Sequence, residues 1–137
     1  MSTSEDVVRA YFDALNERDY DRAAAPFSDD CEFVSVASGV RFKGTESMLH
    51  GLQEFAEAFP DWTVEVRNVV ASGAYVAAEW RTTGTHEGMF RGEAPTGIRF
   101  RCDGCAVAEV VDGRIVRFRD YYDRATLLEQ LGLADVL

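Results

Sequence analysis

Two aspartates near the end of the chain are its best candidates for proton transfer. Asp120 and Asp123 lie in a short run that also contains two tyrosines, at the end of a segment rich in β-favouring residues. Because the side chains of a strand alternate between its two faces, only one of the two aspartates can face a given side of a sheet. If one of them faces a binding cavity, apolar surroundings would raise the pKa of its carboxyl group and make it a useful base.

Asp123 has a second interpretation, as the cap of a helix. It immediately precedes the helical run 124–128, and an aspartate in that position accepts hydrogen bonds from the first free backbone amides. Such contacts would lower the pKa of the carboxyl group and make it a weak base. The sequence leaves both roles open.

A histidine and a glutamate are further candidates. His86 stands near the start of the Gly-rich segment 85–97, and an imidazole transfers protons readily near neutral pH. It could equally close the turn or rim of that loop. Glu109 lies in a predicted strand, where it could face the site or pair with Arg117 or Arg119 across the sheet.

The three cysteines do not predict a metal or redox centre. Cys102 and Cys105 form a C-x-x-C pair, but no second pair of cysteines or histidines completes four ligands. The redox motif normally begins a helix, whereas this pair lies within a β-rich run. Together with Cys31 the cysteines form an odd set in a chain with no export signal, which favours reduced thiols.

The elements that must position these residues change type near Pro60. Apolar residues recur at helical spacing over 4–18 and 45–59, and a short helix is predicted over 19–25. From Trp62 onward the pattern is typical of strands. Strands are predicted over 31–36, 40–43, 62–71, 74–85, 98–111 and 114–122, followed by a terminal helix or tail over 124–137.

This element order predicts an α+β fold. The turns at 72–73 and 112–113 join antiparallel neighbours, and Asp103-Gly104 within a long apolar run indicates a bulge. We expect a cone-shaped, curved antiparallel sheet of four to six strands, whose concave face is covered by the N-terminal helices. In 74–78 and 105–108 apolar residues occupy both alternate sets of strand positions, so apolar side chains are expected on the outer face of the sheet as well as on the inner face. The outer apolar surface must then be buried against something else. We therefore expect a homodimer formed through that face.

Composition narrows the class of protein. A chain of 137 residues with 47% hydrophobic residues suits one domain, 1–137, with a real core. Acidic residues outnumber basic ones 24 to 14, so the surface field disfavours nucleic acid and anionic membranes as partners. No apolar run suggests a signal peptide or a membrane span, and we expect a cytoplasmic location.

Several short motifs resemble one known family. They are Gly84-Thr85-His86-x-Gly88, Pro95-Thr96-Gly97, Asp112-Gly113-Arg114-Ile115, and Asp123 followed by Leu127 and Gln130-Leu131-Gly132. Together with the Tyr11-Phe12 helix and the Phe59-Pro60-Asp61-Trp62 junction, they resemble the SnoaL-like polyketide cyclases of the ketosteroid-isomerase and nuclear-transport-factor superfamily. The likeness covers nearly the whole chain.

The resemblance implies a cone that encloses one apolar pocket and acts on an apolar small molecule. In these cyclases an aspartate on the final strand is the acid/base for an intramolecular aldol closure, without cofactor or metal. By its spacing to Gln-Leu-Gly, Asp123 matches that aspartate, so the resemblance implies that Asp123 rather than Asp120 faces the pocket. The implied wall of the pocket consists of Tyr11, Ser35, Trp62, Val107, Glu109 and Tyr121, of which Tyr11 matches the oxyanion tyrosine of ketosteroid isomerase. The alternative is a non-catalytic binding or dimerisation module of the same fold.

Overall fold

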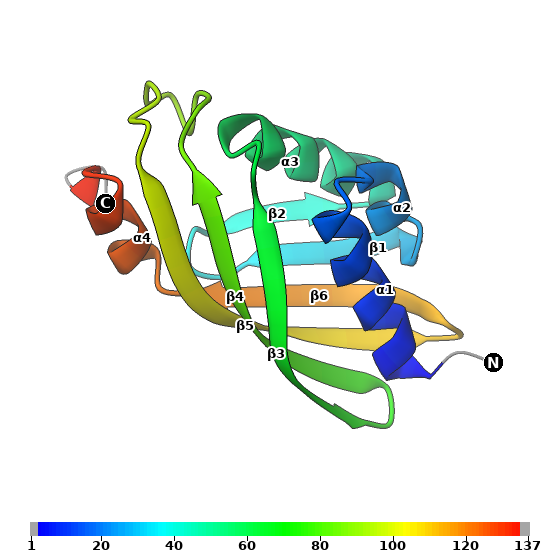
Figure 1. Ribbon diagram of the computed structural model, residues 1–137. Helices are drawn as coiled ribbons and strands as arrows, with labels where there is room; N and C mark the ends of the chain where they lie inside the picture. The colour runs from blue at the N-terminus through cyan, green and yellow to red at the C-terminus, as the bar shows by residue number, and fades with distance from the viewer. Residues whose placement is uncertain (1–2, 135–137) are drawn as a thin grey trace.

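A single six-stranded sheet forms the body of the protein. The computed structural model describes residues 3–134. The strands lie in the order β2-β1-β6-β5-β4-β3, and all neighbours are antiparallel except β1 and β6 (Figure 1). The elements are α1 (Ser4–Asn16), α2 (Tyr20–Ala24), β1 (Phe27–Ser35), β2 (Val40–Lys43), α3 (Thr45–Ala58), β3 (Thr63–Ser72), β4 (Tyr75–Thr85), β5 (Arg99–Val111), β6 (Arg114–Tyr122) and α4 (Arg124–Gln130).

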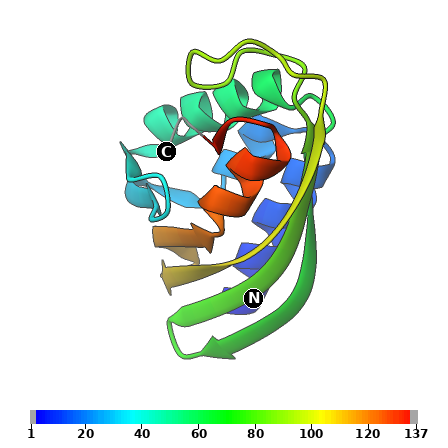
Figure 2. The ribbon, with the colours of Figure 1, turned by 90° about the vertical axis from the view of Figure 1, so that its left-hand side faces the viewer.

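The sheet curves around the helices without closing. Figure 2 shows the long strands β3, β4 and β5 bending around α1 and α3, which lie inside the curve. The predicted α+β fold with a curved, mostly antiparallel sheet is therefore confirmed, with one parallel pair added. The last three residues of the predicted terminal helix or tail lie outside the described residues.

Local sequence accounts for the first helix. The Thr3 hydroxyl accepts from the Asp6 backbone amide, and the Asp6 carboxylate accepts from the Thr3 amide, both at 3.1 Å. This reciprocal cap satisfies two of the amides that a helix start leaves free. Val8, Tyr11 and Leu15 then recur at helical spacing and are buried against the sheet. The helix thus delivers Tyr11 to the inside of the cone.

Strand β6 alternates between an apolar inner face and a charged outer face. Phe118 is buried, whereas Arg117 and Arg119 on either side of it are exposed. Asp120 follows with the same parity as Phe118 and pairs in register with Ser35 of β1. Asp120 therefore lies on the concave side of the sheet, in its middle, between β1 and β5.

Strand β5 is one continuous strand, as predicted, but the bulge predicted at Asp103-Gly104 is wrong. The pairing with β4 runs without a shift through these two residues, and the register shift lies between Glu109 and Val110. Gly104 has another reason to be glycine, because an added Cβ would lie 2.5 Å from the Trp80 ring. Close packing rather than a bulge explains it.

A second apolar cluster packs the end of α3 and helix α4 against β5. The residues of this cluster come from the end of α3, from β5 and from α4, and they are Ala58, Phe59, Phe100, Cys102, Leu127, Leu128 and Leu131. The segment 86–98 between β4 and β5 is anchored to α3, because the Glu87 and Gly88 amides both donate to the Ala58 carbonyl. No helix within residues 3–134 is long and apolar enough to cross a membrane.

Candidate active site

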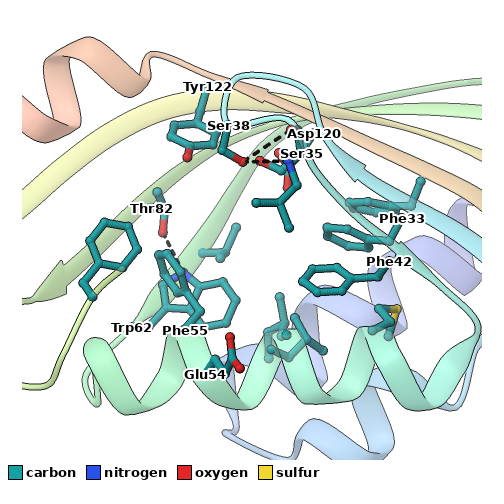
Figure 3. A pocket seen from close by; sticks show the side chains of 18 of the residues that line it. Phe33, Ser35, Ser38, Phe42, Glu54, Phe55, Trp62, Thr82, Asp120 and Tyr122 are labelled. Atoms are coloured by element: carbon teal, nitrogen blue, oxygen red, sulfur yellow. Dashed lines mark hydrogen bonds between the residues drawn. The ribbon is translucent and has the colours of Figure 1, made fainter. Parts of the chain in front are cut away.

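A cavity of about 460 Å³ lies between the concave face of the sheet and helices α1 and α3. This volume lies within the range of small-molecule sites. Its walls are mostly apolar and rich in aromatic residues, among them Phe33, Phe42, Phe55 and Trp62 (Figure 3). The exposed lining residues Glu54, Glu57, Met89 and Arg91 mark what we call the mouth. An apolar ligand of moderate size fits such walls.

Asp120 contributes a carboxyl group to this apolar wall. Its Oδ1 atom is buried and has no hydrogen-bond partner among the described residues. Burial raises the pKa of Asp120 to about 6, although the neighbouring Ser35 hydroxyl acts in the opposite direction. A carboxylate with such a pKa is ionised at neutral pH yet basic enough to accept a proton from carbon or water. Figure 3 shows Asp120 and Ser35 side by side above the cavity.

Two tyrosines bring hydroxyl groups to the same cavity. Burial raises the pKa of Tyr11, and the Asp120 charge raises it further. Burial is also the main cause that raises the pKa of Tyr122, again with Asp120 acting in the same direction. Both phenols therefore keep their protons at neutral pH and can donate hydrogen bonds to a ligand oxygen.

The opposite wall carries polar groups that are already satisfied. Trp62 Nε1 donates to Thr82 Oγ1 at 2.9 Å, and Thr82 Oγ1 donates to the Thr63 carbonyl at 2.9 Å (Figure 3). These bonds fix the indole ring as an apolar surface and leave its N–H unavailable to a ligand. The polar groups that are free to act on a ligand therefore lie on the Asp120 side of the cavity, and the Trp62 side offers mainly an apolar surface.

The prediction that Asp123 faces the cavity is wrong. Its Oδ1 accepts from the Thr126 backbone amide at 3.0 Å, and its Oδ2 accepts from Thr126 Oγ1 at 2.6 Å. These hydrogen bonds lower the pKa of Asp123, whose side chain is exposed. The physical reason is that β6 ends at Tyr122, so Asp123 leaves the strand and becomes the N-cap of α4.

Three other expected wall residues lie on the outer face of the sheet, so their predicted place in the pocket is also wrong. Val107 and Tyr121 are exposed, and Glu109 pairs with Arg117 at 3.4 Å. In β5 the inward positions are instead taken by small buried residues such as Ala106. The structure does place Tyr11, Ser35 and Trp62 in the lining of the cavity.

His86 is fully buried beside the cavity and does not line it. Its Nδ1 accepts from the Thr96 backbone amide at 3.2 Å, and its ring packs on Phe59 with centroids 5.5 Å apart. Its backbone also exchanges hydrogen bonds with Gly97 and Ile98. The expectation that His86 acts in catalysis does not agree with this position, because His86 is not among the residues that line the cavity. It closes the base of the loop 86–98.

Some functional residues escaped the sequence prediction. Phe42, Arg91 and Tyr122 line the cavity, yet nothing in their local pattern marks them. For Asp120 a signal was present. Phe118 is apolar and is flanked by two arginines, which indicates that it points to the inner face of β6. Asp120 is two residues further along the strand and therefore points to the same face.

Comparison with known proteins agrees with the architecture. A family model described as SnoaL-like polyketide cyclase matches residues 5–131. Among curated proteins, epoxide hydrolase EphG of Mycobacterium tuberculosis is 32% identical over 119 residues, covering 85% of this chain and 70% of that protein.

Solved structures extend the comparison. IdmH of Streptomyces antibioticus, proposed to be a polyketide cyclase, superposes with a TM-score of 0.82 and is 28% identical, covering 96% of this chain and 99% of its own. AclR of Streptomyces galilaeus, proposed to be a hydroxylase, also superposes with a TM-score of 0.82 at 27% identity, covering 95% and 85% of the two chains. The three named relatives thus carry three different reaction names on one fold.

Proposed function

Because the chain belongs to the SnoaL-like polyketide cyclase family, we propose that it is an acid/base enzyme that acts without a cofactor on an apolar small molecule bound in the cone. Asp120 is the base. The observation that carries the proposal is its carboxyl group, which is buried in the cavity wall with Oδ1 unpartnered among the described residues. A binding module would gain nothing from an unpaired buried carboxylate, which costs stability.

The reaction that suits this site best is an intramolecular aldol closure. Asp120 takes a proton from a methylene group that lies between two carbonyls, and the electron pair of the C–H bond moves into an enolate. The hydroxyl of Tyr11 or Tyr122 donates to the enolate oxygen. The enolate carbon then attacks a second carbonyl of the same molecule, and the alkoxide that forms takes the proton back from Asp120. The cavity contributes by holding both ends of the substrate close together.

Hydrolysis of an epoxide is a second candidate, favoured by the likeness to EphG at 32% identity. In that reaction Asp120 would remove a proton from water, and the resulting hydroxide would attack an epoxide carbon and break its C–O bond while a tyrosine hydroxyl donates a hydrogen bond to the epoxide oxygen. The alkoxide that forms would take the proton from Asp120, which restores the base. Both reactions need the same base and the same apolar cavity. They differ in whether the electrophile is a carbonyl of the substrate's own chain or a strained ring.

The test is a comparison of two substrate panels with the wild-type protein and an Asp120→Asn variant. One panel holds aromatic polyketide esters with a free β-dicarbonyl methylene, and the other holds aryl and terpene epoxides. Turnover of the esters that the variant loses supports the aldol reaction, and turnover of epoxides that it loses supports hydrolysis. If the protein binds members of either panel but converts none, the protein is a binding module and the proposal is wrong.

A further inference from the structure

Two arginines lie beside Tyr122 at the mouth of the cavity. Arg91, from the loop 86–98, lines the cavity itself. Arg124, the first residue of α4, lines a small groove next to it. The groove and the cavity share Phe90, Arg91, Tyr122 and Leu127. A ligand that fills the cavity would therefore reach Arg91, and a group that extended from it into the adjoining groove would reach Arg124.

Neither arginine is paired with an acid in the described part of the chain. Within residues 3–134 the arginines that form ion pairs up to 4.0 Å are Arg9, Arg22, Arg67, Arg81 and Arg117. The sequence has 24 acidic residues against 14 basic ones. Six other arginines of the described residues are also outside these ion pairs, so the lack of an acidic partner is not special to Arg91 and Arg124. What distinguishes the two is their position beside the cavity.

Arg91 is exposed, but contacts within its own loop hold it in position. Its guanidinium lies 5.6 Å from the centroid of the Phe90 ring, in a cation–π contact. The backbone on either side is fixed, because the Phe90 amide donates to the Glu93 carbonyl at 3.0 Å and the Glu93 amide donates back at 2.8 Å. A cation that is already ordered loses less entropy when an anion binds to it.

The charges of the mouth are divided between its two sides. Glu54 and Glu57 come from α3, and Glu54 pairs with His50 at 2.9 Å. On the other side, Arg91 and Arg124 line the groove beside Tyr122, and their positive charges lower the pKa of Tyr122 against the larger effects of burial and the Asp120 charge. Among the described residues that line the groove, Glu93 is the one acid. The Tyr122 side of the mouth is thus the side that favours an anion.

We propose that Arg91 and Arg124 bind a carboxylate or a similar anionic group of the ligand while its apolar part fills the cavity. The inference rests on the proposed function, because it narrows the substrate class of the same site to apolar molecules that also carry an anionic group, including esters or epoxides with a free carboxylate. Guanidinium groups suit this role because they bind a carboxylate through two parallel hydrogen bonds. With the anion held beside Tyr122, the adjoining carbon chain lies close to Asp120, two residues earlier on the same inner face of β6.

The test uses two fluorescent probes with the same aromatic body. 8-Anilinonaphthalene-1-sulfonate carries an anionic group, and N-phenyl-1-naphthylamine lacks it. We expect Arg91→Gln and Arg124→Gln each to weaken binding of the sulfonate about tenfold, the scale of one lost charge-assisted hydrogen bond, and to leave binding of the neutral probe unchanged. Arg67→Gln is the matched control, because it removes the same charge from β3, away from the cavity lining.

Three results would overturn the inference: no loss for the sulfonate, equal loss for both probes, or an equal loss in Arg67→Gln. Circular dichroism of each variant checks that folding is intact, and the neutral probe reports directly whether the cavity is preserved. The Asp120→Asn variant separates this inference from the proposed function. The arginine site stands and the enzymatic proposal fails if two results occur together. The first is that Arg91→Gln and Arg124→Gln weaken binding of the sulfonate alone, both in the wild type and in the Asp120→Asn background. The second is that the wild type converts no member of either substrate panel.

Discussion

Asp120 and Asp123 lie three residues apart at the end of β6 and have opposite environments. Asp120 lines the cavity with Oδ1 buried and unpartnered among the described residues, whereas both carboxylate oxygens of Asp123 accept hydrogen bonds from Thr126. Burial raises the pKa of the first, and hydrogen bonding lowers the pKa of the second. The same side chain is therefore suited to accept a proton at one position and to cap a helix at the other.

Replacing each of these aspartates with asparagine separates the two roles. We expect Asp120→Asn to lower turnover at least a hundredfold, the scale of a lost general base, because the amide cannot accept the substrate proton. Asp123→Asn is the matched control, since asparagine is itself a good N-cap, and it should keep both turnover and stability. Steady-state kinetics on the converted substrate measures both variants. Full activity in Asp120→Asn would show that Asp120 is not the base.

The pH dependence of the reaction should report the pKa of Asp120. Because burial raises that pKa to about 6, the base is protonated and inactive below this pH. We expect kcat/KM to be level above about pH 7 and to fall about tenfold per pH unit well below pH 6, as for a single essential base. Rates measured from pH 4.5 to 8.5 test this. An inflection near pH 4, typical of an ordinary exposed carboxyl group, contradicts the assignment.

The contribution of Asp120 to folding stability should fall as the pH rises, whereas its contribution to activity should increase. The pKa of Asp120 is about 6 in the folded state and near 3.8 ordinarily. Between these values the unfolded chain loses its proton first, so this group makes folding less favourable as the pH rises, and the effect is complete above pH 6. Asp120→Asn removes the buried charge and should raise the free energy of unfolding by roughly 3 kcal/mol at pH 8 and by less at pH 5.

Urea unfolding of the wild type and of Asp120→Asn at the two pH values measures this difference. Comparing the pair at each pH cancels the titration of the other carboxyl groups, which both proteins share. A difference in unfolding free energy that does not grow between pH 5 and pH 8 would mean that the Asp120 charge is not buried in solution. The variant would then be expected to lose activity without any gain in stability.

The order of helices and strands could be predicted because apolar residues recur at helical spacing in the helices and in alternation in most of the strands. Phe118 among arginines shows how far such local reasoning extends, since it also marks the inner face of β6. The error at Asp123 arose from extending strand alternation past Tyr122, where the chain turns into α4. In β5 the alternation is hidden, because Val107 outside and Ala106 inside are both apolar.

Other parts of the site depend on contacts between distant segments. Asp120 lies beside Ser35 because β1 and β6, separated by most of the chain, pair in parallel. No local pattern specifies that pairing. Likewise, Arg91 and Arg124 meet at Tyr122 only because the loop 86–98 and α4 pack at the same end of the cone. Sequence periodicity specifies faces, whereas the composition of a cavity follows from which faces meet.

The outer face of the sheet predicts a homodimer. Val107 and Tyr121, on neighbouring strands, are 37% and 38% exposed there. Light scattering at micromolar concentration should give twice the mass of the chain, and Val107→Lys should reduce it to a single chain by placing a charge in the contact. Ile98→Lys, at an exposed isoleucine of the loop 86–98, is the control and should remain dimeric. A monomeric wild type contradicts the prediction.

Gly51 of α3 determines how much room the aromatic wall leaves for a ligand. A Cβ added there would lie 2.3 Å from Cζ of Phe42, so in a Gly51→Ala variant the Phe42 ring must move. Both residues line the cavity. We expect this variant to bind N-phenyl-1-naphthylamine at least fivefold more weakly, which corresponds to a loss of about 1 kcal/mol in binding free energy. Alanine favours the helix itself, by about 1 kcal/mol over glycine, so folding should be preserved.

The double variant Gly51→Ala, Phe42→Leu is the test of cause. Leucine is smaller than phenylalanine and removes the ring atoms that the new methyl group would touch, so the double variant should regain affinity for the probe. Fluorescence titration of the wild type, both single variants and the double variant forms a complete cycle. If Gly51→Ala binds the probe as the wild type does, the ligand does not use the part of the cavity next to Phe42. If the double variant fails to regain affinity, the loss comes from α3 and not from the displaced ring.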